Sequence, residues 1–297
     1  MIAHQGEWAA LTTALCWTVT GLAFEAAARR IGSLSVNILR MFAALIFLTL
    51  FSAISRGRFF PFDADVHTWF WLSLSGLVGF TLGDLALFRG YLLIGARRTL
   101  LIAAFVPVFT ALGGWLLLDE TLNARDWCGM ALTIAGVAVV ILERRADAAA
   151  VPRKTLWLGV LLGLCAALGQ AVGLAFSKKG IGDFDPFAAT QIRAFAGTIG
   201  FMVIFTAIRW WPNVWQAAKD YPAMQRLTLG AFFGPFLGVG FSLMAVQHAK
   251  AGVAATIMSL TPVFIIAPAA LIFKEKFTAR AFAGAALAVG GSALLFM

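Results

Sequence analysis

Residues 106–142 read VPVFTALGGWLLLDETLNARDWCGMALTIAGVAVVIL, and residues 261–297 read TPVFIIAPAALIFKEKFTARAFAGAALAVGGSALLFM. An offset of 155 residues aligns the two stretches, and over the wider window 91–142 it gives 14 identical residues in 52 aligned positions. Apolar composition alone would give about a third of that number, so the chain carries an internal repeat. The matched residues are prolines, glutamates and glycines: Pro107 and Pro262, Glu120 and Glu275, Gly129 and Gly284, and Gly136 and Gly291.

The composition places this repeat in a lipid bilayer. Hydrophobic residues make up 61% of the 297 residues, charged residues make up 12%, and the mean hydropathy is +0.88. A soluble chain has about 25% charged and about 45–50% apolar residues. The composition therefore excludes a soluble enzyme, a coiled coil and a disordered protein, and it favours a protein with many membrane spans. The scarcity of charges favours helices over a β-barrel, whose strands alternate apolar and polar residues.

Ten apolar segments are long enough to cross the hydrocarbon core as helices, which takes about 20 residues. We therefore predict an all-α integral membrane protein, with one five-helix repeat in residues 1–150 and a second in residues 151–297. The first segment is expected to remain as a span, because no basic region of a cleavable signal precedes it. The predicted spans are Trp8–Ala27, Leu34–Ile54, Thr68–Phe88, Leu100–Leu118, Trp127–Leu142, Leu156–Phe176, Pro186–Ile208, Leu227–Gln247, Val253–Phe273 and Ala281–Met297.

Each predicted repeat has an odd number of spans, so the second repeat must enter the membrane upside down relative to the first. Inverted repeats of this kind are the architecture of many secondary transporters, which bind substrate in a central cavity near the midplane. An offset of 153 residues also aligns Arg40 with Arg193, each about two turns inside its predicted span.

The five-plus-five arrangement resembles the drug/metabolite transporter superfamily, and its EamA-type members in particular. The resemblance is carried by a proline, a short apolar run, a glutamate near the span's end and a glycine-spaced helix, which occur in both halves as quoted above. The family's arginine early in the second span matches Arg40 and Arg193. This resemblance covers nearly the whole chain. It implies a basket of helices around a central cavity, and often export of amino acids or other small metabolites.

Features that recur in both halves are expected to serve the shared scaffold. Pro107 and Pro262 lie inside predicted helices, where each is either a gating hinge or a static kink. Glu120 and Glu275 are each followed five residues later by an arginine, which favours interfacial ion pairs.

The remaining scaffold features are arginines and glycines. Arg40 and Arg193 are each expected either to snorkel back to the lipid headgroups or to bind a carboxylate in the cavity. Pairs of glycines four residues apart let helices pack closely, or slide as a pore opens. These pairs, in the third and eighth predicted spans, are Gly79 and Gly83, and Gly234 and Gly238.

Asp84 is the only acidic residue well inside a predicted span, and the second repeat has no equivalent carboxylate. An isolated carboxylate in hydrocarbon costs at least a few kcal/mol, so Asp84 must face a cavity or a partner. It shares a helical face with Phe80 and Phe88, which suits an amine with an apolar body. The alternatives are a coupling proton on Asp84 and an ion pair with Arg40 or Arg193. The other predicted substrate-binding residues are Trp17, Gln170, Phe241, Met244, Ser259 and Thr261.

The sequence offers little for enzyme chemistry. It has no HExxH, GxSxG, P-loop or paired intramembrane aspartates, and its three cysteines lie apart within apolar runs. No metal site and no cofactor are predicted. The net charge of +9 comes from Lys and Arg in short loops, which favours contact with anionic lipid over nucleic acid.

Two indications of orientation disagree. Loops after odd-numbered predicted spans contain 15 Lys and Arg residues, and loops after even-numbered spans contain 6. Positive residues favour the cytoplasmic side, so this count predicts that both termini lie outside the cytoplasm. The family resemblance implies that both termini lie inside.

The leading hypothesis is a secondary transporter of the bacterial inner membrane that exports amino acids or similar small metabolites by alternating access. Export rather than import is implied by the resemblance alone. The alternatives are a membrane-embedded enzyme acting on lipid, a channel-like facilitator of another metabolite, and a receptor or assembly partner with a filled core. The expected partners are a small-molecule substrate and membrane lipid, and proton coupling is left open.

Overall fold

The computed structural model of the chain is a bundle of helices, described here for residues 4–143, 152–265 and 279–296. No strand occurs in these ranges. Eight helices are long and apolar enough to cross a membrane, and two shorter apolar helices cover Ala251–Phe264 and Ala279–Leu294. The two short helices begin close to the starts of the predicted ninth and tenth spans. Glu275, one of the predicted scaffold residues, lies outside the described residues.

In the first half, the helices follow the predicted first, second and fifth spans, whereas the helix of the predicted third span continues to Ala103, past the start of the predicted fourth span. Its elements are α1 (Gln5–Ile31), α2 (Ser33–Arg56), α3 (Val66–Ser75), the π-helical segment η1 (Gly76–Gly83), α4 (Asp84–Ala103), α5 (Val106–Leu118) and α6 (Ala124–Glu143). The segments α3, η1 and α4 run on without a break, and this continuous helix contains the predicted third span.

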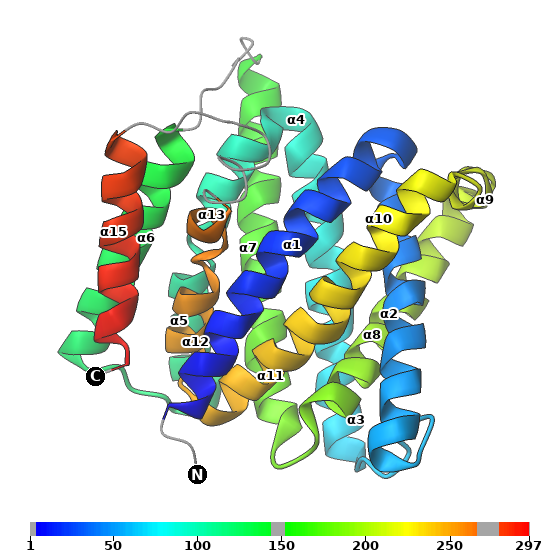
Figure 1. Ribbon diagram of the computed structural model, residues 1–297, viewed down its shortest axis with the longest axis horizontal. Helices are drawn as coiled ribbons and strands as arrows, with labels where there is room; N and C mark the ends of the chain where they lie inside the picture. Colours follow the sequence, from blue (N-terminus) through cyan, green and yellow to red (C-terminus); the bar gives the residue numbers. More distant parts are fainter. Residues whose placement is uncertain (1–3, 144–151, 266–278, 297) are drawn as a thin grey trace.

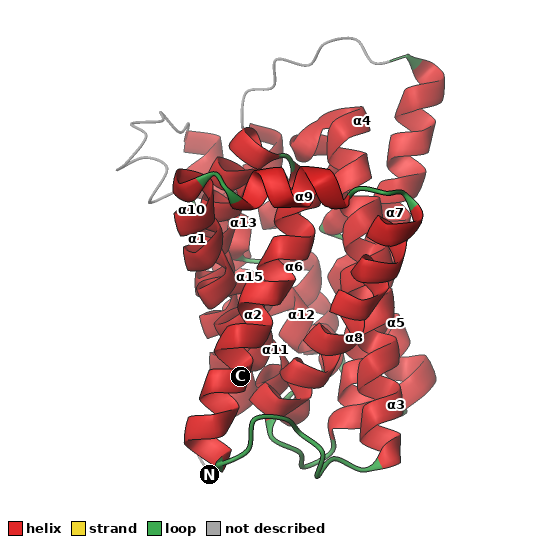
Figure 2. Ribbon diagram, turned by 90° about the vertical axis from the view of Figure 1, so that its right-hand side faces the viewer, coloured by secondary structure: helices red, strands yellow, loops and turns green. Residues whose placement is uncertain are grey.

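The second half repeats this order with two differences. Its described elements are α7 (Arg153–Ile181), α8 (Pro186–Ala207), α9 (Trp211–Ala218), α10 (Tyr221–Ala231), η2 (Phe232–Gly238), α11 (Val239–His248), α12 (Ala251–Met258), α13 (Thr261–Phe264) and α15 (Ala279–Leu294). The short helix α9 is added, and two helices, α11 and α12, correspond to the continuous α4. The short helix α9 lies across the ends of the long helices (Figure 2). It occupies the connection between the predicted seventh and eighth spans and so lies outside the predicted spans.

Both prolines of the repeated motif lie at an interruption within an apolar helical stretch, Pro107 in Leu101–Leu118 and Pro262 in Ala251–Phe264. Such an interruption is a kink, one of the two predicted alternatives, and a role as a gating hinge stays a prediction. Helix α4 ends at Ala103, and Pro107 lies in the first turn of α5; Pro262 likewise lies in the first turn of α13. The physical reason is that N–H groups of a first turn have no partner within the helix, so a residue without an N–H costs nothing there. Each proline therefore marks a break between two helices.

The glycine pairs lie in two π-helical segments at equivalent places in the two halves. The segment η1 contains Gly79 and Gly83, and η2 contains the corresponding pair. A Cβ on Gly79 would lie 3.7 Å from the Cα of Gly173 in α7. Such small residues allow helix backbones to approach closely. Whether these helices slide during function stays a prediction.

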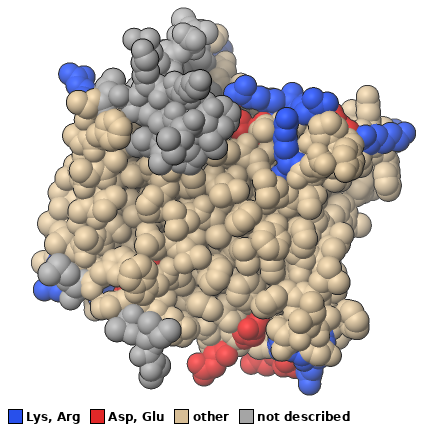
Figure 3. All heavy atoms as spheres, viewed as in Figure 1, with Lys and Arg blue, Asp and Glu red and all other residues tan. Residues whose placement is uncertain are grey.

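The outer surface fits a bilayer. In Figure 3 the charged side chains gather at two ends of the molecule, and a broad band between them is almost free of charge. Large apolar side chains point outward from this band, among them Ile46 on α2 and Val203 on α8, with exposed fractions of 60% and 64%. In water this surface would be unfavourable, whereas lipid tails solvate it. The chain is therefore a multi-pass membrane protein.

Helices α6 and α15 pack tightly side by side through glycines (Figure 1). A Cβ on Gly129 would lie 2.9 Å from the carbonyl oxygen of Gly291, and one on Gly136 would lie 2.5 Å from that of Gly284. The pairing of low with high residue numbers means that the two helices are antiparallel. Helix α6 corresponds to the predicted fifth span, and α15 corresponds to the predicted tenth span.

We expect Gly136→Ala to destabilise the protein by about 1–3 kcal/mol, because the added methyl group has no room against α15. Gly290→Ala is the matched control, since nothing lies within 4 Å of a Cβ at that position. Alanine favours a helix over glycine, so the control should melt at or above the wild-type temperature. Thermal unfolding in detergent micelles measures both, and equal melting temperatures for the two variants would contradict the packing argument.

Candidate functional site

A cluster of polar side chains joins the two halves of the chain inside the bundle. Asp84 begins α4 directly after the wide turns of η1, and only 5% of its surface is exposed. Nη2 of Arg40 in α2 donates to Oδ2 of Asp84. Nε2 of Gln170 in α7 donates to Oδ1 over 2.8 Å. We call Arg40, Asp84 and Gln170 the Asp84 cluster; two of its members come from the first half and one from the second.

This cluster satisfies the requirement that a buried carboxylate have partners. Of the alternatives for Asp84, the structure contains the ion pair with Arg40. The guanidinium of Arg40 also lies near the ring of Phe24, with Cζ 5.7 Å from its centroid. Arg40 therefore turns toward the interior rather than to the headgroups, and the expectation that it snorkels is wrong.

Arg193, the repeat counterpart of Arg40, is also buried, with 5% of its surface exposed. Its Cζ atom lies 4.8 Å from the centroid of the Phe80 ring, a cation–π contact. Within the described part of the chain it has no hydrogen-bond or ion-pair partner, and its Nε is sealed from solvent. The expectation of snorkelling is therefore wrong for Arg193 as well.

Asn37 adds a further polar group to this region of the sequence. It is fully buried on α2, one turn before Arg40, and both atoms of its side-chain amide lack a hydrogen-bond partner among the described residues. Buried amides normally have partners, so such an orphaned group marks a place where a water or a ligand belongs. Sequence reasoning overlooked Asn37, although it is the only amide in the predicted second span.

The apolar residues predicted to bind substrate lie in two different parts of the interior. Trp17, Phe241 and Met244 are half-buried and pack against one apolar cluster formed by α1, α5, α6, α11 and α12. Phe80 belongs to a second cluster, which includes residues of α2 and α8. Phe88 is half-buried on α4, one turn after Asp84.

The two hydroxyl groups predicted near Pro262 bond to the backbone. Oγ of Ser259 donates to the carbonyl of Thr256 over 2.7 Å, and Oγ1 of Thr261 donates to that of Met258 over 3.0 Å. Thr261 also lies 3.4 Å from the carbonyl oxygen of Ala14 in α1. Both hydroxyls thus donate to backbone carbonyls at the end of α12. Their predicted contact with substrate stays a prediction.

At the end of the bundle that holds both termini, Glu120 makes a contact that differs from the prediction. Its carboxylate pairs with Lys178 of α7 over 2.5 Å and accepts the backbone N–H of Ala251 over 2.9 Å. The predicted partner was Arg125. Instead Glu120 caps the N-terminus of α12, where the helix dipole favours an anion. The contact joins α5 of the first half to α7 and α12 of the second.

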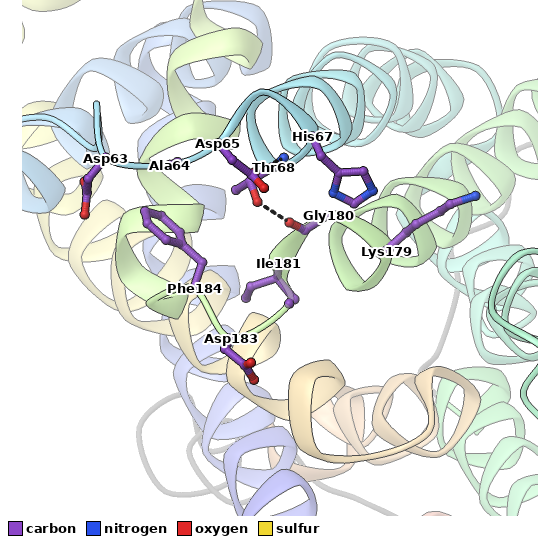
Figure 4. Close-up of a pocket in the computed structure, with 11 residues that line it drawn as sticks. Asp63, Ala64, Asp65, His67, Thr68, Lys179, Gly180, Ile181, Asp183 and Phe184 are labelled. Atoms are coloured by element: carbon purple, nitrogen blue, oxygen red, sulfur yellow. Dashed lines mark hydrogen bonds between the residues drawn. The ribbon is translucent and has the colours of Figure 1, made fainter.

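Two open pockets lie at the end of the bundle where α3 begins and α7 ends. One has a volume of about 420 Å³ and is lined by Asp63, Asp65, His67, Lys179 and Asp183, among others (Figure 4). The hydrogen bond from Oγ1 of Thr68 to the carbonyl of Gly180, drawn there, is 2.9 Å long.

The other pocket has a volume of about 570 Å³ and includes Gln247 and His248. Asp65 lines the first of these pockets. The backbone N–H of Thr68 donates to its carboxylate and lowers the pKa of that group, so Asp65 is ionised at neutral pH. Neither of these pockets is lined by Asp84.

The ion pair at Asp84 generates a test of stability. Arg40→Gln should destabilise the protein by about 3–5 kcal/mol, because it leaves a buried carboxylate without its cation. The double variant Arg40→Gln/Asp84→Asn should recover much of this loss. Arg29→Gln, which breaks the exposed pair with Glu25, is the matched control and should cost less than about 1 kcal/mol. Melting curves in detergent measure all three variants. If the double variant is less stable than Arg40→Gln alone, the ion pair between Arg40 and Asp84 is refuted.

Comparison with known proteins agrees with this architecture. The chain is 25% identical over 254 residues to an uncharacterized transporter of Synechocystis sp., a match that covers 80% of this chain and 74% of the relative. A crystal structure of a protein with 18% sequence identity superposes with a TM-score of 0.73, covering 97% of this chain and 94% of that one, which shows a shared fold. The model of the EamA-like transporter family matches residues 4–142 and again residues 157–297. The chain therefore belongs to the EamA-like transporter family, as a membrane protein built from two copies of its repeat.

Proposed function

We propose that this protein is a secondary transporter that exports amino acids or similar small metabolites by alternating access. The observation that carries the proposal is the Asp84 cluster, in which side chains of both family repeats meet inside membrane-spanning helices. A polar group in that position is costly unless it serves a ligand, an ion or a partner helix. Its position at the junction of two repeats is where transporters of this architecture bind substrate.

We further propose that the ten predicted helices form two inverted repeats. Support comes from α6 and α15, which occupy equivalent places in the repeats and run antiparallel. It also comes from α1 and α7, because Gly6 near the start of α1 and Lys178 near the end of α7 both contact Ala249. Equivalent helices thus begin at opposite ends of the bundle.

Alternating access requires contacts between the repeats that can break and re-form. At one end, Glu120 joins the first repeat to α7 and α12 of the second. This contact is well placed to hold that end closed, because separating the repeats there exposes the N-terminus of α12. Within the bundle, protonation of Asp84 would release Arg40, which gives a coupling proton a defined effect.

Counterflow in proteoliposomes tests the transport proposal. Vesicles preloaded with a mixture of amino acids should take up external labelled neutral amino acids, and Asp84→Ala should reduce this uptake at least about tenfold, because it removes the centre of the cluster. Gly290→Ala, on the lipid-facing side of α15, serves as the matched control and should transport normally. Absence of exchange with every amino acid would refute this substrate class, and normal exchange by Asp84→Ala would exclude Asp84 from the mechanism.

The bacterial inner membrane is the proposed location, with both termini outside the cytoplasm. The ring centroids of Trp8 and Phe296 are 5.4 Å apart, so the two ends of the chain lie on one side of the bundle. Arg29 and Arg30 lie in the last turn of α1, and Arg226 donates to the carbonyl of Ala26. All three therefore lie at the opposite end, which the charge count assigns to the cytoplasm.

A reporter fused after Met297 tests this orientation. Alkaline phosphatase is expected to be active and green fluorescent protein dark, because the fusion point lies on the less basic side. A fusion in the connection between α8 and α9 should give the opposite pair of signals. Cytoplasmic signals from the fusion after Met297 would overturn the orientation.

A further inference from the structure

We propose that Arg193 is the anion-binding subsite of this transporter, and that it pairs with a single negative charge on a ligand. The inference rests on the proposed transport function only in treating this ligand as cargo. The argument uses charge balance, repeat symmetry and the partners of each nitrogen and oxygen atom.

The charges around Asp84 do not balance. Arg40 and Arg193 supply two positive charges, and Asp84 is the only carboxylate in the described residues that pairs with either. Both oxygens of Asp84 already accept hydrogen bonds, Oδ2 from Arg40 and Oδ1 from Gln170. Arg193 is close enough to Asp84 for electrostatic attraction but makes no hydrogen bond with it. One buried positive charge therefore remains without its own anion.

The repeat explains why the second anion is missing. The two arginines are equivalent by an offset of 153 residues, and the equivalent of Asp84, at an offset of 155, is Val239. Val239 is buried in an apolar cluster. The first half thus holds a complete Arg–Asp pair and the second half holds only the arginine. A buried cation without a partner is unfavourable, so the structure leaves a position that an external anion fills.

The guanidinium is positioned to accept such an anion. Its plane stands over the ring of Phe80, which holds the side chain in place and provides an apolar surface beside it. Among its three nitrogens only Nε is both sealed from solvent and unpartnered. The two Nη atoms, which likewise make no hydrogen bond to the described residues, are not fully sealed and retain some accessible surface. A planar guanidinium with two accessible nitrogens matches the geometry of a carboxylate.

Two sources of this negative charge are distinguishable. One is the carboxylate of an organic substrate, and the other is a free inorganic anion such as chloride. Asp84, held by Arg40 and Gln170, has no oxygen without a partner for an ammonium group in this conformation. The anionic part of a ligand is thus recognised by Arg193 of the second repeat and not by the Arg40–Asp84 pair of the first.

The test is thermal unfolding of the purified, full-length protein in detergent, followed by tryptophan fluorescence. The probes are monocarboxylates, their uncharged amides and sodium chloride, at ionic strength held constant with a bulky sulfonate. Wild type should melt at a higher temperature with the anions than with the amides. Arg193→Met, which keeps the packing on Phe80, should lose this shift, whereas Arg193→Lys should retain part of it with about tenfold weaker binding.

Asp84→Asn is the matched variant within the site, because it removes negative charge beside Arg193. It should retain or strengthen the anion-dependent shift. Stabilisation by carboxylates alone identifies the substrate's own carboxylate, and equal stabilisation by chloride identifies a free anion; both support the subsite. Absence of any shift in wild type, or a full shift in Arg193→Met, overturns it.

The outcome is separable from that of the transport proposal. If wild type is stabilised by carboxylates but exchanges no amino acid, the substrate class proposed above fails and the anion subsite stands. If amino acids exchange in counterflow but their amides compete equally well, and Arg193→Met exchanges normally, transport stands and the subsite fails. Without ligand, Arg193→Met should melt at or above the wild-type temperature, because the buried charge that it removes has no hydrogen bond or ion pair among the described residues; a clear decrease counts against the proposal.

Discussion

The hydrocarbon core of a bilayer contains no water to solvate a charge, and this constraint organises the interior of the bundle. Asp84 is tolerated there because Arg40 and Gln170 both donate to it from other helices. The pair ties α2 to α4, and the amide ties α4 to α7, so this cluster links the two repeats inside the bundle.

The same constraint acts on the backbone. Before Pro262, Oγ1 of Thr261 donates to the carbonyl of Met258, which a proline at position 262 leaves without its N–H partner. At η1 the backbones come close, because a Cβ on Gly79 would lie 3.7 Å from the Cα of Gly173 in α7. Contacts between helices of the two repeats are the ones that must change as the repeats of a transporter move.

Particular residues show how far sequence reasoning reached. Repetition indicated the two halves and their matched glycines, because packing against an equivalent helix demands the same small residues twice. Asp84 stood out because a carboxylate is rare in an apolar span. The partners of charged residues were harder to predict. Glu120 pairs with Lys178 rather than with the nearby Arg125, since a connecting loop separates neighbours in sequence whereas helix packing joins distant ones. Asn37 was overlooked although, like the predicted Gln170, it is the single amide of its span; what distinguishes it is that both its amide atoms lack a partner among the described residues, which only the structure shows.

The sequence by itself determined the membrane class, the helical segments, the repeat and the family resemblance. These follow from local composition and periodicity, which depend only on the contrast between lipid and water. Only the tertiary structure decided which arginine neutralises Asp84 and which one is left without a carboxylate. Sequence makes Arg40 and Arg193 equivalent, and the packing of α2 and α8 around one asymmetric aspartate makes them different. Pairing depends on distances across the bundle, and those distances are set by how all the helices pack together.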